Sequence, residues 1–581
     1  MHVKAGTLLA QAPAGDWLVF ADPREVLCAY APAEVSSVLA AVDRALADGK
    51  HVAGFLAYEA ACAMDAALET HSAAGVPLAW FGVYDAPDRI DALPEPAGAD
   101  FPVLDWQPDT TREAYGAAID RIRSYIASGD TYQVNYTMRL RARFAGDAYA
   151  LFVRLCRAQA PRHAVFGDLG DWAVCSASPE LFFEKCGEAI LARPMKGTAA
   201  RGLTEAEDAC IREALAHCPK NRSENVMIVD MIRNDLGRIA EPGSVVPAPL
   251  FGVERYPTLF QMVSTVRART RAPFSQTVRA LFPCASITGA PKVRTMQIIK
   301  ALESSPRHFY TGMAGYCTPD GLSRFNVMIR TVTVDKRSGT AEYGVGGGIV
   351  WDSVEQHEYD ECLTKAAVLT YAPPAFELLE TLCYTPGEGY AYLEAHMERA
   401  GASAQYWGYP FDAEQMQQAL EQAVLGKRVS QRVRWLLARD GRMRVASVDL
   451  QPLGPRPVGV AAVGACRRQD VFLYHKTTQR VAYETAQVAF PDCGDVILVN
   501  EAGEVTESCL GNVVFERDDR KYTPPVACGL LDGTMRRTLV AAGEIGEAQL
   551  LREDLLACDR LWLINSVRGW MPLTKAQLRF A

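Results

Sequence analysis

Hydrophobic and polar positions alternate with two different periods along the chain. Short apolar runs predict strands, and longer stretches with apolar residues three or four positions apart predict amphipathic helices. The two kinds are interspersed, with strands expected at residues 17–20, 173–175, 344–350, 495–500 and 512–516, and helices at residues 112–128 and 205–216. This mixture predicts an α+β fold.

One boundary divides this pattern. A helical stretch at residues 358–369 ends at Tyr371-Ala372-Pro373-Pro374, and two prolines cannot continue a helix. A fresh apolar pattern begins at Phe376. We therefore expect two domains, residues 1–372 and 375–581. A second proline-rich stretch, residues 91–102, is expected to be a surface loop.

Composition and charge narrow the class of protein. The chain has 581 residues, 49% of them hydrophobic and 22% charged, and its net charge of -9 disfavours nucleic acid as the main partner. Its 16 cysteines form no C-x-x-C pair, which is typical of reduced thiols rather than of a disulfide framework. No signal segment and no apolar run of about 20 residues is present, so we expect a cytoplasmic protein without a membrane span.

The string RPMKGT, residues 193–198, places Lys196 between a proline and a glycine. A lysine that is buried beside other cations loses its proton and becomes a nucleophile. A solvated lysine after a strand is the commoner case, and this string by itself leaves both interpretations open.

Carboxylates recur on two predicted helices. Glu224 and Asp230 lie in an amphipathic segment at residues 221–238, whereas Glu358 and Glu361 are three residues apart and share a face of another helix. Carboxylates from two helices that met at one point would hold Mg²⁺ beside an anionic substrate, although each alone is usually solvated.

Two further features suit an anion. Residues 344–348 contain four glycines in a strand pattern, which bares the backbone either for an anion or for a close strand crossing. Arg330 lies in an apolar strand pattern, where its guanidinium needs a partner, either a ligand carboxylate or a structural salt bridge.

Taken in order, these strings resemble one family. The order PMKGT, SENVMIVDMIRNDLGR, PCASITGAPKVRTMQII, YTGMAGY, FNVMIRT, GVGGGIVWDS and EYDECLTKA is similar to that of the chorismate-utilising enzymes, over about residues 112–370. That family includes anthranilate synthase component I, aminodeoxychorismate synthase component I, and the isochorismate and salicylate synthases. Lys196 matches the lysine that aminodeoxychorismate synthases carry in this motif, whereas anthranilate synthases carry alanine there.

The resemblance implies a role for each matching residue. Lys196 would be the nucleophile that attacks chorismate, and Glu180 the acid/base near the leaving hydroxyl. The implied substrate contacts are Arg330, Tyr310, Gly346, Gly347 and Thr198, and the implied Mg²⁺ ligands are Glu224 and Glu361, with Glu358 as a near or water-mediated partner. Gln261 stands where several relatives have histidine, so it is given no acid/base role.

No amidotransferase nucleophile motif of the GxCxGxQ type occurs in the chain. The resemblance therefore implies a separate glutamine amidotransferase subunit that supplies ammonia.

The segment after residue 375 carries a second set of candidates. His396 and Arg399 are three apart and would share a helix face, His396 as a packing residue or a ligand, and Arg399 as a phosphate clamp or a surface residue. Lys476 follows an apolar strand-like run, and a lysine held in a pocket forms a Schiff base, although a solvated lysine is commoner. Glu507 would suit a protonated pyridine nitrogen, and residues 531–537 open a helix whose first N–H groups suit a phosphate.

This set resembles the fold-type IV pyridoxal-phosphate enzymes over about residues 376–572. The resemblance implies Lys476 as the cofactor lysine, Glu507 as the pyridinium partner, and a phosphate cup of Arg399, Thr534, Met535 and Ser566. Thr381 and the string NSVRGWMP at residues 565–572 look most like aminodeoxychorismate lyase, which makes Thr381 a catalytic candidate. The first strand of free-standing relatives is missing before residue 376 or is supplied by the preceding domain. A homodimer through this domain is also suggested.

Together the resemblances imply a large domain of β-sandwich and helices followed by a fold-type IV α+β domain. The first would aminate chorismate to 4-amino-4-deoxychorismate with Mg²⁺. The second would use pyridoxal 5'-phosphate to eliminate pyruvate and leave p-aminobenzoate, a folate precursor. The alternative is an anthranilate- or salicylate-type enzyme joined to a branched-chain or D-amino-acid-type aminotransferase, and Lys196 argues against the anthranilate version.

Overall fold

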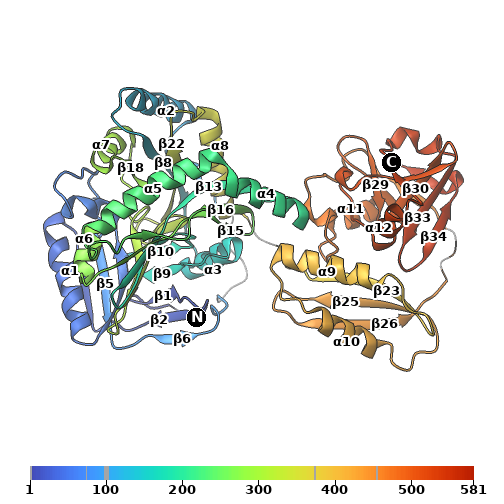
Figure 1. The fold of residues 1–581 in the computed structure, drawn as a ribbon, viewed down its shortest axis with the longest axis horizontal. Coiled ribbons are helices and arrows are strands. Elements are labelled where there is room, and N and C mark those ends of the chain that lie inside the picture. Colours follow the sequence, from blue (N-terminus) through green and yellow to red (C-terminus); the bar gives the residue numbers. More distant parts are fainter. Residues whose placement is uncertain (1–2, 74, 97–103, 372–373, 453, 455) are drawn as a thin grey trace. The chain divides into compact units, whose positions relative to one another are not determined.

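The computed structural model describes residues 3–73, 75–96, 104–371, 374–452, 454 and 456–581. By its internal contacts the chain separates into two units, Met1–Ala200 with Arg212–Pro373, and Arg201–Ile211 with Pro374–Ala581 (Figure 1). Residues 97–102 of the expected surface loop and residues 372–373 of the proline boundary lie outside the described residues.

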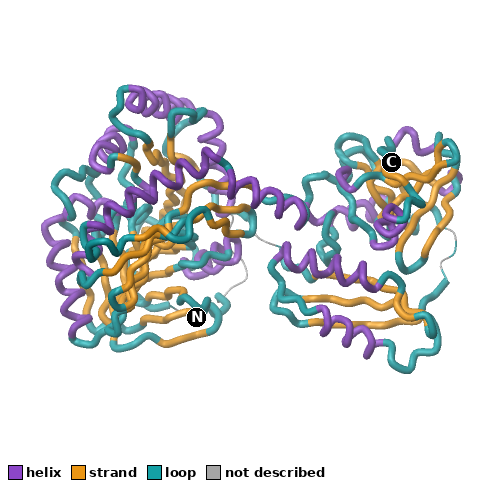
Figure 2. Tube along the Cα trace, viewed as in Figure 1, coloured by secondary structure: helices purple, strands orange, loops and turns teal. Residues whose placement is uncertain are grey.

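The first unit is built on two large antiparallel sheets that pack face to face. Apolar side chains of both sheets, among them Phe20, Phe55 and Val174, meet in the layer between them. Two further apolar clusters lie on the outer faces, where helices cover the strands (Figure 2). This layered arrangement of helices and sheets confirms the predicted α+β class.

The strands of the first unit are given in spatial order. The first sheet contains β18 (Gly289–Ala290), β8 (Gln133–Arg143), β22 (Thr340–Ile349), β21 (Thr331–Asp335), β10 (Trp172–Ser176), β9 (Val165–Asp168), β1 (Leu8–Gln11), β2 (Trp17–Phe20) and β6 (Asp88–Ile90), with β7 (Gln107–Pro108) beside β8. The second contains β14 (Val246–Pro247), β17 (Val266–Arg269), β12 (Ala189–Arg193), β11 (Leu181–Cys186), β20 (Leu322–Val327), β19 (Met313–Cys317), β4 (His51–Leu56), β5 (Ala79–Tyr84) and β3 (Glu25–Ala29). A small sheet contains β13 (Met195–Ala200), β16 (Leu259–Val263) and β15 (Gly252–Arg255).

The helices of this unit supply the outer layers. Those whose apolar residues join the cluster on the second sheet are α1 (Pro32–Ala47), α5 (Pro219–Gly237) and α6 (Phe274–Leu281). Those that join the cluster on the first sheet are α2 (Arg112–Ala127), α3 (Ala148–Gln159), α7 (Lys292–Leu302) and α8 (Glu355–Ala366). Short 3₁₀ helices are η1 (Tyr58–Ala63), η2 (Ala285–Ile287) and η3 (Ala367–Leu369).

The second unit also has two sheets. One contains β24 (Gly389–Tyr390), β23 (Leu378–Thr385), β25 (Gln431–Leu437) and β26 (Met443–Asp449), and α9 (Leu393–Trp407) and α10 (Ala413–Ala423) pack on one of its faces. The other contains β32 (Gly546–Glu547), β31 (Arg520–Thr523), β30 (Asn512–Arg517), β29 (Val505–Ser508), β28 (Asp495–Val499), β27 (Val458–Val460) and β35 (Leu578–Phe580). In addition, β33 (Arg560–Asn565) pairs with β30, and β34 (Gly569–Leu573) pairs with β33. Its helices are η4 (Val471–Leu473), α11 (Val481–Ala489), η5 (Val526–Cys528), α12 (Thr534–Ala541), η6 (Arg552–Leu556) and η7 (Lys575–Gln577). In the part of the chain that the structure describes, no helix has the length and apolar character needed to cross a membrane.

A segment from the middle of the chain, residues 201–211, belongs to the second unit. It consists of a loop and the beginning of α4 (Glu205–His217), and its Arg201 forms a buried ion pair with Asp208 at 2.5 Å. The Arg201 guanidinium lies 3.8 Å from the centre of the Tyr406 ring, and the Tyr406 hydroxyl donates to the Gly202 carbonyl at 2.7 Å. The second unit is therefore completed by sequence that precedes residue 374 by more than one hundred and fifty positions.

We expect Arg201→Ala to lower the free energy of unfolding of the second unit by about 3–5 kcal/mol, because it leaves the buried Asp208 carboxylate without its cation. Urea denaturation followed by circular dichroism measures this change. Arg442→Ala is the matched control, since that side chain is 84% exposed and pairs with an exposed carboxylate. Equal, small effects of the two substitutions would contradict the prediction.

Candidate active sites

Lys196 lies on β13 at a β-bulge. Between the pairs Met195–Val263 and Thr198–Gln261, β13 has one residue more than β16, and Gly197 takes a φ of +93°. Gln261 secures the bulge, because its Nε2 donates to the Gly197 carbonyl at 2.9 Å and its Oε1 accepts from the Thr198 hydroxyl at 3.0 Å. A bulge redirects the side chain it carries, so this local distortion determines where the Lys196 amine lies.

Charged groups surround that amine. Burial lowers the pKa of Lys196, and the nearby Lys365 ammonium lowers it further. Three carboxylates raise it, those of Glu180, Glu224 and Glu361. The structure thus brings the predicted nucleophile, the predicted acid/base and two predicted metal ligands into one electrostatic neighbourhood.

Glu180 is buried, with 3% of its surface exposed. Burial raises the pKa of this carboxyl to about 7, although the Ser286 hydroxyl and the Lys196 ammonium lower it. Its Oε1 has no hydrogen-bond partner within the described residues. A carboxyl that titrates near neutral pH beside an amine with a lowered pKa suits proton transfer.

The glycine strand β22 runs beside this neighbourhood. A Cβ on Gly348 would lie 3.0 Å from Lys196 Nζ and 2.0 Å from Gln133 Nε2, and one on Gly347 would lie 3.2 Å from Glu358 Oε2. The bare backbone therefore makes room for side chains of the site.

Gln133 was not predicted as a site residue, because a single glutamine in a strand carries no signal. It is buried, and its Oε1 has no partner among the described residues.

Two of the three predicted metal ligands, Glu361 and Glu358, are engaged with other groups. Glu361 Oε1 lies 2.6 Å from Lys365 Nζ, and Glu358 Oε1 accepts from the Ser353 hydroxyl at 2.7 Å. In the described part of the chain, no three His, Cys, Asp or Glu side chains are grouped closely enough to hold a metal ion. The carboxylate chemistry suits Mg²⁺, but binding would require Glu361 to exchange Lys365 for the cation.

Arg330 does not lie in a strand, and that prediction is wrong. It occupies the bend between β20 and β21 with a φ of +52°, and its guanidinium donates to the Lys365 carbonyl at 2.8 Å. Tyr310 is buried, with the Arg139 guanidinium 5.3 Å from its ring centre. The Gly346 carbonyl accepts from Lys365 Nζ at 2.9 Å. Lys365 therefore contacts Arg330, Gly346 and Glu361. It was missed as a site residue, although its spacing of four from Glu361 places it on the same helix face.

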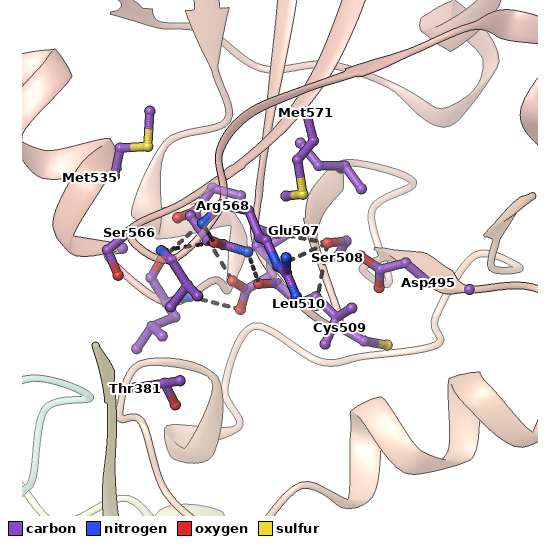
Figure 3. A pocket seen from close by; sticks show the side chains of 18 of the residues that line it. Thr381, Asp495, Glu507, Ser508, Cys509, Leu510, Met535, Ser566, Arg568 and Met571 are labelled. Carbon is purple, nitrogen blue, oxygen red and sulfur yellow. Dashed lines mark hydrogen bonds between the residues drawn. The ribbon is translucent and has the colours of Figure 1, made fainter. Parts of the chain in front are cut away.

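The second unit contains a cavity of about 870 Å³. Every residue predicted for the cofactor site lines it, together with the predicted catalytic threonine: Thr381, Arg399, Lys476, Glu507, Thr534, Met535 and Ser566. In Figure 3, Met535 and Ser566 lie on one side of the cavity and Asp495 on the opposite side.

Lys476 follows the 3₁₀ helix η4 rather than the expected strand, so that prediction of local structure is wrong. Its carbonyl accepts from the Leu379 N–H at 2.9 Å, which ties the lysine to strand β23. Burial lowers the pKa of Lys476 to about 8, and the Arg399 guanidinium contributes in the same direction. The amine is therefore partly deprotonated near neutral pH, as a lysine that forms a Schiff base requires.

Glu507 lies on β29 and is 4% exposed. Burial raises its pKa to about 7, whereas hydrogen bonds to the carboxylate lower it. It accepts from the Tyr483 hydroxyl at 2.7 Å, from the Leu531 N–H at 2.9 Å and from Asn512 Nδ2 at 3.3 Å. Because these donors hold it in place, the carboxylate suits a fixed cationic partner in the cavity.

The network of Glu380 was not found from the sequence. Glu380 accepts from Arg399 Nε at 2.9 Å and from Arg399 Nη2 at 2.7 Å, and it lies 2.6 Å from His396 Nδ1. His396 Nε2 in turn lies 3.0 Å from the Ser566 hydroxyl and 3.2 Å from the Thr534 hydroxyl. Burial lowers the pKa of His396, which favours the neutral ring. In that form Nδ1–H donates to Glu380, and Nε2 accepts from one hydroxyl at a time.

These residues fit pyridoxal phosphate by the chemistry of their groups. Helix α12 begins at Thr534, so the N–H groups of its first turn have no partner within the helix. Together with the hydroxyls of Thr534 and Ser566 they suit a phosphate, while Lys476 and Glu507 supply the amine and the carboxylate. Arg399 lines the cavity, but its guanidinium is already paired with Glu380. It therefore stabilises the cavity wall more than it binds the phosphate directly.

The first site has a lysine on a β-bulge beside a carboxyl suited to proton transfer. The second is a separate cavity with a lysine and a buried carboxylate. Together they define an enzyme with two sites. The chain belongs to the family described as chorismate binding enzyme, whose model matches residues 6–371. Residues 377–576 match the model described as amino-transferase class IV. Both resemblances that the motifs indicated are thus confirmed.

Curated relatives match the first part of the chain. Aminodeoxychorismate synthase component 1 of Klebsiella aerogenes is 42% identical over 289 residues, 48% of this chain and 64% of that protein. The protein of the same name from Bacillus subtilis (strain 168) is 35% identical over 295 residues, 50% of this chain and 61% of the relative. The chain thus spans less than two thirds of the length of these relatives. Anthranilate synthase component I from Streptococcus pneumoniae TIGR4 has the same fold, with a TM-score of 0.53 and 22% identity over 64% of this chain and 91% of that one.

Glu380→Gln is expected to lower the free energy of unfolding at pH 7 by about 3 kcal/mol. Burial raises the pKa of Glu380, but the Arg399 guanidinium and His396 outweigh it and lower the pKa from 4.5 to about 2. The charge therefore stabilises the fold above pH 4.5, and this contribution is lost as the pH falls toward 2. Urea denaturation at several pH values should show the difference between the two proteins shrinking below pH 4.5.

Glu377→Gln is the control, since that carboxylate lies three positions away and pairs with an exposed arginine. A pH-independent difference for Glu380→Gln would show that its charge does not stabilise the fold.

Proposed function

We propose that the chain makes p-aminobenzoate from chorismate in two steps. The first unit aminates chorismate to 4-amino-4-deoxychorismate, and the second unit removes pyruvate from that compound with pyridoxal 5'-phosphate. The observation that carries the proposal is the pair of half-buried lysines, each with a lowered pKa and each beside a buried carboxyl, Glu180 and Glu507. The names of the relatives, aminodeoxychorismate synthase component 1, agree with the first step.

In the first step the Lys196 amine attacks C2 of chorismate, and the C4 hydroxyl leaves as water with a proton from Glu180. Ammonia then adds at C4 and Lys196 departs from C2, so the amine is regenerated. The pKa of Glu180, near 7, lets it give and regain the proton. Glu224, Glu358 and Glu361 would hold Mg²⁺, with Arg330, Tyr310, Thr198, Gly346 and Gly347 nearest to the substrate carboxylates.

In the second step Lys476 takes the proton from C4, and pyruvate leaves from C3 so that the ring becomes aromatic. Pyridoxal phosphate supplies the electron sink for this proton removal. Glu507 would hold the pyridine nitrogen, and Thr381 lies at the cavity wall where it can deliver a proton. Thr534, Met535, Ser566 and Arg399 form the surroundings of the phosphate.

The proposal includes partners and location. A separate glutamine amidotransferase subunit supplies ammonia, and the relatives' name, component 1, supports this part of the proposal. The reaction takes place in the cytoplasm, where chorismate and reduced thiols coexist, and the second domain pairs as a homodimer.

Two lysine substitutions test the proposal. With chorismate, Mg²⁺, ammonium and pyridoxal phosphate, Lys476→Ala should accumulate 4-amino-4-deoxychorismate and lack the visible absorbance of bound cofactor. Lys196→Ala should leave chorismate unchanged, yet convert supplied 4-amino-4-deoxychorismate to p-aminobenzoate at the unaltered rate. Chromatography of the products measures both.

Lys427→Ala, an exposed lysine outside both sites, is the control and should behave as the unaltered chain. Anthranilate or salicylate among the products, or p-aminobenzoate from Lys476→Ala, would refute the proposal.

A further inference from the structure

The cavity of the second unit holds more positive charge than a cofactor phosphate needs. Arg432, Arg434 and Arg568 all line it, and within the described residues none of them forms an ion pair with a carboxylate. The contrast with two neighbours is direct, because Arg399 is paired with Glu380 and Arg444 with Glu377. A guanidinium left without a carboxylate partner inside a cavity is a binding site for an anion.

Strand register explains why two of these arginines point into the cavity. In the pairing of β23 with β25, Thr381 lies opposite Arg434, and Cys383 opposite Arg432, so all four side chains are on one face of the sheet. The other face, which includes Val433 and Trp435, packs against α9 and α10. Arg432 and Arg434 are exposed and share their face with the predicted catalytic threonine.

Arg568 reaches the cavity from the turn between β33 and β34. Asn565 fixes this turn, since its Oδ1 accepts the N–H of Val567 at 3.0 Å and of Arg568 at 2.8 Å, and its Nδ2 donates to the Leu510 carbonyl at 3.0 Å. Arg568 Nη1 donates to the Gln451 carbonyl, which orients the guanidinium. Figure 3 shows Arg568 between Ser566 and Ser508 in the view, away from Thr381.

The acids that line the cavity do not neutralise these cations. Glu507 accepts three hydrogen bonds, from Tyr483, Leu531 and Asn512. Asp495 accepts from the Val496 N–H at 2.8 Å, and burial raises its pKa to about 6. Two separate walls, the β25 strand and the β33–β34 turn, therefore each present unneutralised guanidinium groups.

We propose that this cavity selects a substrate with two carboxylates, one bound by Arg432 and Arg434 on the β25 wall and the other by Arg568 on the turn. The inference rests on the proposed function and deepens it, because 4-amino-4-deoxychorismate carries two carboxylates whereas a simple amino acid carries one. A ligand with one carboxylate can bind either wall, but only a dicarboxylate uses both at once.

The test compares isophthalate, which has two carboxylates on a ring, with benzoate, which has one. Both are titrated into the full chain loaded with pyridoxal phosphate, and the visible absorbance of the cofactor reports binding in this cavity alone. We expect isophthalate to bind at least tenfold more tightly than benzoate. Arg568→Gln should remove at least tenfold of the isophthalate affinity and change benzoate by less than threefold, since the other wall still binds one carboxylate.

Arg434→Gln and Arg432→Gln, at exposed strand positions, provide the same comparison if Arg568→Gln does not fold. Arg444→Gln is the matched control on the neighbouring strand, and it should leave both affinities unchanged. Equal affinity for the two ligands, or equal losses of both in the variants, would overturn the inference. This readout needs no turnover, so a chain that prefers isophthalate yet forms no p-aminobenzoate would refute the proposed function and leave the dicarboxylate site standing.

Discussion

Both sites depend on the burial of a lysine amine among other charges. An ammonium group is stable in water, and its removal from water favours the neutral amine unless a carboxylate compensates fully. At Lys196 and at Lys476 burial is the largest effect on the pKa, a second cation acts in the same direction, and carboxylates oppose it. Burial and the second cation thus favour the neutral amine at both lysines, and at Lys476 they lower the pKa to about 8.

Supporting structure around each lysine follows from this requirement. The bulge at Gly197 and the bare strand at Gly348 let the Lys196 amine lie within a crowded polar neighbourhood. In the second unit, Glu380 compensates the buried Arg399 and orients His396, which in turn reaches the Ser566 hydroxyl. A buried charge is costly without a partner, so this network holds the cavity walls in a single arrangement before any ligand binds.

Helices with a strong amphipathic periodicity could be predicted from the sequence. Candidate site residues could also be predicted where they stand in long motifs. The helices at residues 112–128 and 205–216 are α2 and α4 to within one residue at each end. Lys196, Lys476 and Glu507 were singled out from short strings, and the structure places each of them among charged side chains. Local surroundings of Arg330 and Lys476 were predicted wrongly, because an apolar run does not distinguish a strand from a bend or a 3₁₀ turn.

Residues that act through distant contacts carry no local signal. Glu380 stands in an apolar strand, and only the approach of α9 reveals that it pairs with His396 and Arg399. The contribution of residues 201–211 to the second unit is likewise invisible without the fold. Arg432 and Arg434 are different, because two arginines with a spacing of two on a strand predict one charged face.

The central claim, that one chain joins amination to pyruvate release, is tested most directly by an isotope. The full chain is incubated with chorismate, Mg²⁺, pyridoxal phosphate and ¹⁵N-ammonium, and the products are quantified by mass spectrometry. The account predicts p-aminobenzoate with one ¹⁵N atom and one pyruvate released per molecule. Labelled anthranilate, or p-aminobenzoate without the label, would contradict it.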